Sequence, residues 1–246
     1  MLYKLRAIII KIEKKFKISL FFIFPLRFIL VCFEKFFLQK STEISNLSNY
    51  KLDFEKLKNK DLNIISAGVG TDISFENEII DKFSVKKMVL IDPSIESQNI
   101  ASSKKLTFEK AALYTKIGEK KIFRVFGDKN LSLENLFGSK HFDLINTITI
   151  DYVMKKHSYT KLDILKLDVE GVADKIIDNC LSNYILPDQI CFELERPLRL
   201  SKQFNYFRRF INIIFLLKKY NYKLYNCTNL KLGLRSEILA VKNENK

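Results

Sequence analysis

The chain has 246 residues, a formal net charge of +14 and 47% hydrophobic residues. This length can bury a core, and the apolar content excludes a disordered chain. Four scattered cysteines form no CxxC pair and no zinc-binding spacing, so we expect reduced thiols in a cytoplasmic protein. The positive charge leaves two classes of partner to weigh, nucleic acid and an anionic membrane surface.

Half of the net charge lies in residues 1–40, which hold nine basic residues, two acidic residues and eight of the 21 phenylalanines. On a helical projection of residues 2–17, apolar side chains fall on one arc and basic ones on the rest, as in a helix lying in a membrane interface. Residues 18–33 are too short for a span of about 20 residues. We therefore expect residues 1–45 to form a basic, amphipathic helical extension. It either contacts the inner membrane peripherally, through residues 1–40, or packs on the protein's own core.

We interpret residues 46–60 as a linker and lead-in, and residues 61–246 as one domain. Within the domain, short apolar runs alternate with helical patterns. The apolar runs predict strands at 63–67, 88–91, 106–113, 121–126, 162–167, 189–194, 222–225 and 237–241. Helical patterns occupy 73–83, 172–181 and 204–220, and residues 147–150 lead into a further short helix. This alternation predicts a doubly wound, mostly parallel α/β sheet.

Ligands of such sheets bind at the carboxyl ends of the strands, where two features stand out. Gly68 and Gly70 follow the first predicted strand, in SAGVGTDIS, and Asp92 follows the second. A glycine turn followed about 20 residues later by an acid is typical of nucleoside binding. Ile73 stands where a dinucleotide site has its third glycine, which disfavours a dinucleotide. An ordinary structural glycine turn remains the alternative.

A second cluster lies in LDILKLDVEG, residues 162–171. Lys166 and Asp168 share one side of the predicted strand, and Glu170 lies at the turn into a helix. Ionisable residues at the exit of a buried strand are costly unless they are paired or functional. The alternative is that Asp168 caps the following helix while Lys166 neutralises it.

These stretches resemble the FkbM-type methyltransferases, which use S-adenosylmethionine and have the class I methyltransferase fold. The likeness covers roughly residues 60–242 and rests on SAGVGTDISFE, IDP, EKAALY, TITID and LDILKLDVEG, with CFELE adding to it. The chain departs from the family pattern at three positions. Ser66 replaces the usual opening acid, Asp72 a later glycine, and Asp92 the usual Glu before Pro93.

The resemblance implies a set of site residues. Those facing the cofactor would be Ser66, Gly68, Val69, Gly70, Asp92, Pro93, Ala111 and Ala112. Asp168 and Glu170 would face the methyl group and the acceptor as candidate general bases, with Lys166, Glu193 and Glu195 as acceptor-binding groups. A divalent ion could sit among these carboxylates, but the spacing does not require one. His157 is a base by type, in a polar helix end that favours a solvated surface position.

The implied activity is methylation of a hydroxyl oxygen, on a glycan or its lipid-linked precursor. The sequence contains no P-loop, HExxH, GxSxG or kinase motif, and no [DN]PP[YF], RRM or zinc-finger signature. Nucleic acid is therefore the less favoured partner. Two alternatives stay open: a non-catalytic binding or scaffold module, suggested by Ser66 and Asp72, and a basic nucleic-acid methyltransferase.

Overall fold

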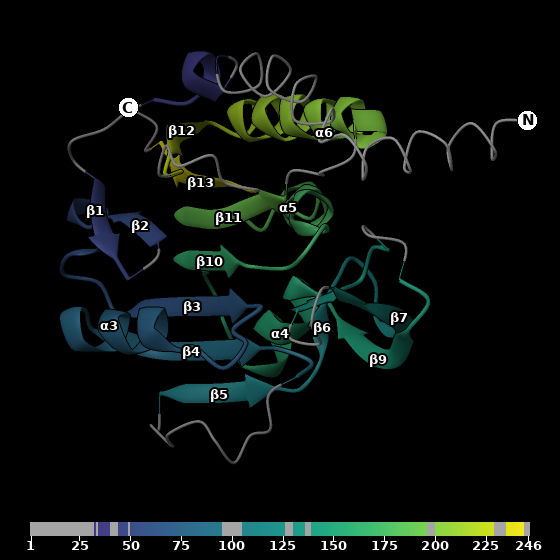
Figure 1. Ribbon diagram of the computed structural model, residues 1–246. Helices are drawn as coiled ribbons and strands as arrows, with labels where there is room; N and C mark the ends of the chain where they lie inside the picture. Colours follow the sequence, from purple (N-terminus) through teal and green to yellow (C-terminus); the bar gives the residue numbers. More distant parts are fainter. Residues whose placement is uncertain are drawn as a thin grey trace, which may run out of the picture.

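The computed structural model describes residues 32, 34–39, 44–48, 50–94, 105–125, 130–135, 139–195, 200–228 and 235–243. Within them, seven strands form a sheet in the order β12-β13-β11-β10-β3-β4-β5. Their bounds are β3 Leu62–Ala67, β4 Val85–Ile91, β5 Leu106–Glu109, β10 Ile164–Leu167, β11 Gln189–Glu195, β12 Tyr222–Asn226 and β13 Arg235–Lys242. β13 pairs antiparallel with both of its neighbours, β11 and β12, and the other pairs in this sheet are parallel (Figure 1). The predicted fold class is confirmed.

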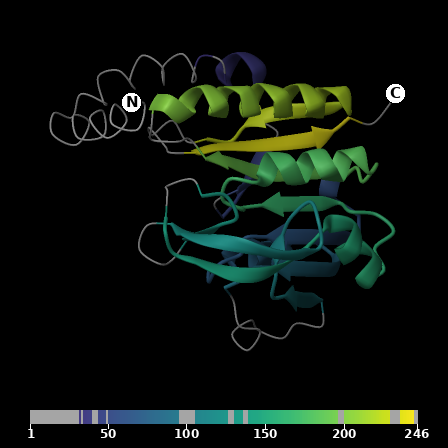
Figure 2. The same cartoon turned by 90° about the vertical axis from the view of Figure 1, so that its right-hand side faces the viewer.

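Helices cover both faces of this larger sheet. Helix α3 (Ser74–Lys82) packs on one face, and α4 (Ile150–Lys156), α5 (Ala173–Ser182) and α6 (Leu200–Lys219) pack on the other. Figure 2 shows α6 and α5 running along the sheet. Because neither face meets water, the central strands are continuous apolar runs, and all four residues of β10 are buried.

A smaller sheet lies beyond the carboxyl ends of the parallel strands (Figure 1). Its order is β6-β9-β7-β8, with bounds Ala112–Leu113 for β6, Gly118–Val125 for β7, Asn130–Ser132 for β8 and Phe142–Ile148 for β9. The predicted strand 106–113 therefore divides between two sheets. The pattern missed β9 because its first residues are exposed and do not form a buried apolar run.

The stretch interpreted as a linker is instead folded onto the core. Strands β1 (Ile44–Leu47) and β2 (Tyr50–Asp53) form an antiparallel hairpin, followed by a 3-10 turn at Glu55–Leu57. Leu47, Leu52 and Leu57 are at most 1% exposed. Polar residues separate these leucines, which made the segment look like a linker, but the alternating pattern buries one face of the hairpin against the sheet.

Residues 1–31 of the predicted extension lie outside the described residues. The end of the extension packs on the core: Leu38 is buried, and buried Glu34 accepts hydrogen bonds from Tyr206 Oη (3.2 Å) and Ser236 Oγ (2.6 Å). The core-packing alternative therefore holds for this short part. No helix in the described part of the chain is long and apolar enough to cross a membrane.

Candidate functional site

A cavity of about 340 Å³ opens at the carboxyl ends of β3, β4 and β10. The smaller sheet closes its other side through Ile122 of β7 and Leu131 of β8. The position is the one where doubly wound sheets bind ligands, and the volume suits a small molecule. Of the sequence-predicted cofactor residues, Gly68, Val69, Gly70, Asp92, Pro93, Ala111 and Ala112 line it.

The two glycines after β3 serve different purposes. Gly68 has φ +75°, and a Cβ there would lie 1.8 Å from the carbonyl oxygen of Asp168. Only glycine therefore allows the loops after β3 and β10 to pack so closely. Gly70 has φ +58° but open space where its Cβ would be, so no protein contact requires a glycine there and only the backbone conformation favours one.

Asp92 ties the glycine loop to the end of β4. It is buried, its Oδ2 accepts from the Gly70 N–H at 2.9 Å, and its Oδ1 accepts from the Ser94 N–H at 2.7 Å and from the Ser94 hydroxyl. A carboxylate offers about four acceptor positions. About one is left for a ligand, so this geometry suits a hydrogen bond from a single hydroxyl.

The first turn of α3 distinguishes the cavity from a phosphate site. A helix N-terminus after a glycine loop commonly binds a phosphate group. Here Asp72 Oδ1 accepts the Ser74 N–H at 3.0 Å, and hydrogen bonds from the side chain and backbone of Ser74 hold the pKa of Asp72 below its usual value. The carboxylate of Asp72 thus occupies the position at which a helix N-terminus would otherwise bind a phosphate group.

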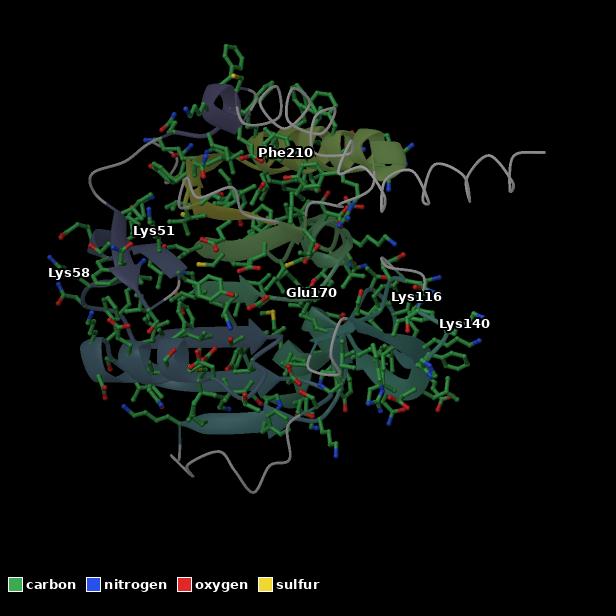
Figure 3. All side chains as sticks on the ribbon, in the orientation of Figure 1. Lys51, Lys58, Lys116, Lys140, Glu170 and Phe210 are labelled. Carbon is green, nitrogen blue, oxygen red and sulfur yellow. The ribbon has the colours of Figure 1, made fainter. Side chains whose placement is uncertain are left out.

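The loop after β10 supplies the remaining polar wall, with Asp168 and Glu170 among the lining residues. Tyr50 Oη donates to Asp168 Oδ2 at 2.7 Å, and Ser132 Oγ donates to the Glu170 carbonyl at 2.8 Å. Figure 3 shows Glu170 at this edge of the sheet. The alternative in which Asp168 caps α5 is wrong, because the N-terminus of α5 receives no side-chain cap.

Four predicted residues lie away from the cavity wall: Ser66, Lys166, Glu193 and Glu195. Ser66 is fully buried and donates to Glu76 Oε1 at 2.5 Å, and Lys166 Nζ is 3.4 Å from the same oxygen. Glu193 is buried near the end of β11 and is absent from the lining of the described cavities. Strand periodicity turns Ser66 and Lys166 toward α3, away from the exposed strand ends.

His157 is also elsewhere, and the expectation of a solvated surface position is wrong. Its Nε2 lies 2.7 Å from Glu109 Oε1, and both side chains are largely buried. Burial raises the pKa of Glu109, but hydrogen bonds from Lys156 and His157 outweigh it and leave the pKa lowered. The contact is a structural hydrogen bond. No group of three or more His, Cys, Asp or Glu suited to a metal ion occurs in the described part of the chain.

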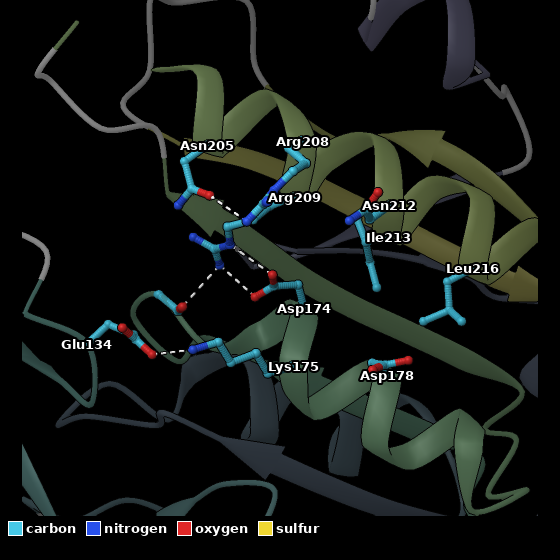
Figure 4. A pocket seen from close by; sticks show the side chains of 11 residues that line it. Glu134, Asp174, Lys175, Asp178, Asn205, Arg208, Arg209, Asn212, Ile213 and Leu216 are labelled. Carbon is cyan, nitrogen blue, oxygen red and sulfur yellow. Dashed lines mark hydrogen bonds and ion pairs between the residues drawn. The ribbon is translucent and has the colours of Figure 1, made fainter. Parts of the chain in front are cut away.

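A second depression, of about 570 Å³, runs between α5 and α6 and begins at Gly171, next to Glu170 (Figure 4). Arg209 crosses it: its Nε and Nη2 lie 2.8 and 2.6 Å from the two carboxylate oxygens of Asp174, and Nη2 also donates to the Gly171 carbonyl at 3.0 Å. This bidentate pair fixes the turn that carries Glu170.

Glu195 ends β11 beside that turn. Its Oε2 is buried and has no hydrogen-bond partner among the described residues. Burial and the nearby Glu170 charge raise the pKa of Glu195 to about 8, while the Gly171 N–H and Arg209 oppose the shift. The carboxyl is therefore mostly protonated at neutral pH.

Sequence patterns missed several wall residues. Ile122 and Leu131 come from the smaller sheet, whose approach to the strand ends is a tertiary feature. Tyr50 does not line the cavity itself but binds the wall residue Asp168, and it comes from the supposed linker, although the alternation of Tyr50 and Leu52 was a visible strand signal. Asp72 and Ser94 flank predicted site residues and could have been included by proximity.

No protein-family model and no curated protein matches the chain. Similar solved structures include precorrin-6y C5,15-methyltransferase from Geobacter metallireducens GS-15, with 11% identity and a TM-score of 0.39 over 85% of this chain and 95% of that one. The small RNA methyltransferase HEN1 has 13% identity and a TM-score of 0.38, over 78% of this chain and 24% of that one. Human N-acetylserotonin methyltransferase, in complex with SAM, has 12% identity and a TM-score of 0.33, over 74% and 47%.

Proposed function

We propose that the protein is an S-adenosylmethionine-dependent methyltransferase of the FkbM type. The charge of the cavity carries the proposal. The described lining has four carboxylates, Asp72, Asp92, Asp168 and Glu170, and no lysine or arginine, in a chain of net charge +14. S-adenosylmethionine has a sulfonium, an ammonium and one carboxylate, so it is a net cation that this wall attracts. A dinucleotide's pyrophosphate would be repelled.

The residues present fit this cofactor, which supplies a methyl group activated by the positive charge on its sulfur. The open backbone at Gly70 lets the methionine part approach the loop closely. Asp92 has an acceptor position left for a ribose hydroxyl. Ala111 and Ala112 provide a small apolar border for the adenine.

The acceptor in this proposal is a hydroxyl of a glycan or lipid-linked glycan. A hydroxyl oxygen is a poor nucleophile while it holds its proton, so a nearby base assists transfer. Glu170 and Asp168 line the cavity at the strand end and are the candidates to accept that proton. Glu195 lies next to Glu170 but lines neither the cavity nor the groove between α5 and α6, so we assign it no contact with the acceptor. The LDILKLDVEG stretch supports the family assignment.

Calorimetric titration of the purified chain with S-adenosylmethionine, S-adenosylhomocysteine and NAD⁺ tests the cofactor. We expect S-adenosylmethionine to bind more tightly than S-adenosylhomocysteine, which lacks the sulfonium charge, and NAD⁺ not to bind. A folded chain that binds no S-adenosylmethionine would overturn the proposal and favour the non-catalytic alternative. Transfer of a labelled methyl group to purified glycans then tests the acceptor class.

We also propose that the basic leader brings the protein to an anionic membrane where a lipid-linked acceptor resides. Its composition supports this, with seven of the fourteen net charges in residues 1–40. A variant that lacks the leader tests this proposal. It should lack residues 1–31 only, because Glu34 and Leu38 belong to the core. Loss of co-sedimentation with anionic vesicles, with cofactor binding retained, is the expected result. Unchanged co-sedimentation would refute the anchor.

A further inference from the structure

Tyr50 lies where the sequence suggested a linker, yet it reaches the wall of the cavity. It begins β2, is 9% exposed, and donates its hydroxyl to Asp168 Oδ2 at 2.7 Å. Its ring packs edge-to-face on Phe75 of α3, with centroids 5.2 Å apart. The hydroxyl is therefore held in place by a buried ring rather than by a flexible chain.

The same ring covers Lys166, the basic residue two positions before Asp168. Lys166 Nζ lies 4.9 Å from the Tyr50 ring centroid and 5.5 Å from that of Phe75. Its ion-pair partner is Glu76 Oε1, at 3.4 Å, and both side chains are at most 4% exposed. Glu76 also accepts from Ser66, so the pair is anchored to β3 as well as to α3.

Strand periodicity alone would place Lys166 beside Asp168 and cancel its charge. The structure instead divides the two residues between different partners. Glu76 engages the lysine in the core, the Tyr50 ring covers the ammonium group, and the Tyr50 hydroxyl binds the carboxylate. Asp168 thereby presents its carboxyl group at the cavity wall, in an orientation set by the hydrogen bond from Tyr50.

We propose that Tyr50 is a positioning residue: with the Glu76–Lys166 pair behind it, it holds the Asp168 carboxylate toward the cationic part of the cofactor. This inference rests on the proposed function. It makes the β1–β2 hairpin part of the active-site structure. It also assigns discrimination between the cofactor and its product, which lacks the sulfonium charge, to a residue outside the family motifs.

The test compares the affinities of the full chain for S-adenosylmethionine and S-adenosylhomocysteine in Tyr50→Phe. This variant keeps the ring over Lys166 and removes only the hydroxyl. A hydrogen bond to a charged group is strong, so we expect the dissociation constant for S-adenosylmethionine to rise about fivefold and that for S-adenosylhomocysteine less than twofold. A merely structural defect would weaken both ligands equally.

Tyr159→Phe is the matched control, because its buried hydroxyl also donates one hydrogen bond, to the Ile64 carbonyl at 3.1 Å, away from the cavity. It should leave the ratio of the two dissociation constants unchanged. In an Asp168→Asn background, adding Tyr50→Phe should change the ratio no further, because the hydroxyl acts through the carboxylate.

If the wild-type chain binds S-adenosylmethionine and Tyr50→Phe leaves the ratio of the two dissociation constants unchanged, the inference is overturned. The proposed function then still stands. Equal weakening of both ligands also overturns it, since Tyr50 would then be structural. If the wild-type chain binds neither ligand, the proposed function fails and the inference fails with it.

Discussion

Replacing Glu195 by Gln should stabilise the protein at high pH and change it little at low pH. Burial and the Glu170 charge raise the pKa of Glu195 from 4.5 to about 8. At pH values between 4.5 and about 8, the folded state therefore holds a proton that the unfolded state has released. Wild-type stability falls as the pH rises through this range and then levels off. At about 1.4 kcal/mol per pKa unit, the accumulated loss is at most about 5 kcal/mol.

Urea unfolding of wild type and Glu195→Gln at pH 5 and pH 9 measures this loss. The difference in unfolding free energy between the two proteins should be about 3–5 kcal/mol more favourable to the variant at pH 9 than at pH 5. Effects of the amide itself cancel, because they are the same at both pH values. Glu119→Gln, at an exposed position of β7, should show a gap within about 0.5 kcal/mol at both. An equal gap for Glu195→Gln at pH 5 and pH 9 would refute the reasoning.

Four further substitutions test other parts of the structure. Gly68→Ala should abolish cofactor binding and lower the melting temperature. Gly70→Ala is strained only by its positive φ and should lower the free energy of unfolding by about 1 kcal/mol in denaturant titration. Equal effects of the two substitutions would contradict the close packing of the loops at Gly68. Asp92→Asn cannot accept hydrogen bonds through its amide nitrogen, so the affinity for S-adenosylmethionine should fall about tenfold or more by calorimetry, and wild-type affinity would argue against a ribose contact. His157→Gln weakens a contact that lowers the pKa of Glu109. A lowered carboxyl pKa stabilises the fold above pH 4.5, and this gain is lost in acid. The variant should therefore be about 0.5–1.5 kcal/mol less stable than wild type at pH 6 and nearly equal to it at pH 3. A deficit that persists at pH 3 would exclude this mechanism.

Local patterns predicted the parts of the fold that depend on local chemistry. The runs at Asn63–Ala67 and Gln189–Leu194 lie within β3 and β11, because buried parallel strands must be apolar on both faces. The glycines and Asp92 were found for a similar reason. A close backbone approach requires glycine, and an acid after the second strand meets the same sheet edge.

Charge partners could not be predicted, because they depend on how distant segments pack. The spacing of Lys166 and Asp168 is the same whether the two neutralise each other or not. The packing of α3 brings Glu76 to Lys166, 90 residues away in the sequence. The packing of the hairpin brings Tyr50 to Asp168, 118 residues away. The alternation within residues 46–60 indicates a strand, but it does not indicate that Tyr50 binds Asp168 at the cavity wall.

The sequence by itself determined a doubly wound sheet, a glycine loop followed by an acid, and a strongly basic chain, since each follows from residue type and periodicity. The tertiary structure alone decided where the charge acts. It gathers four carboxylates into a cavity with no described basic side chain in its wall, leaves the Glu195 carboxyl buried beside Glu170, and keeps Lys166 behind the Tyr50 ring. Burial and contact between distant segments set these interactions, and no local pattern encodes either.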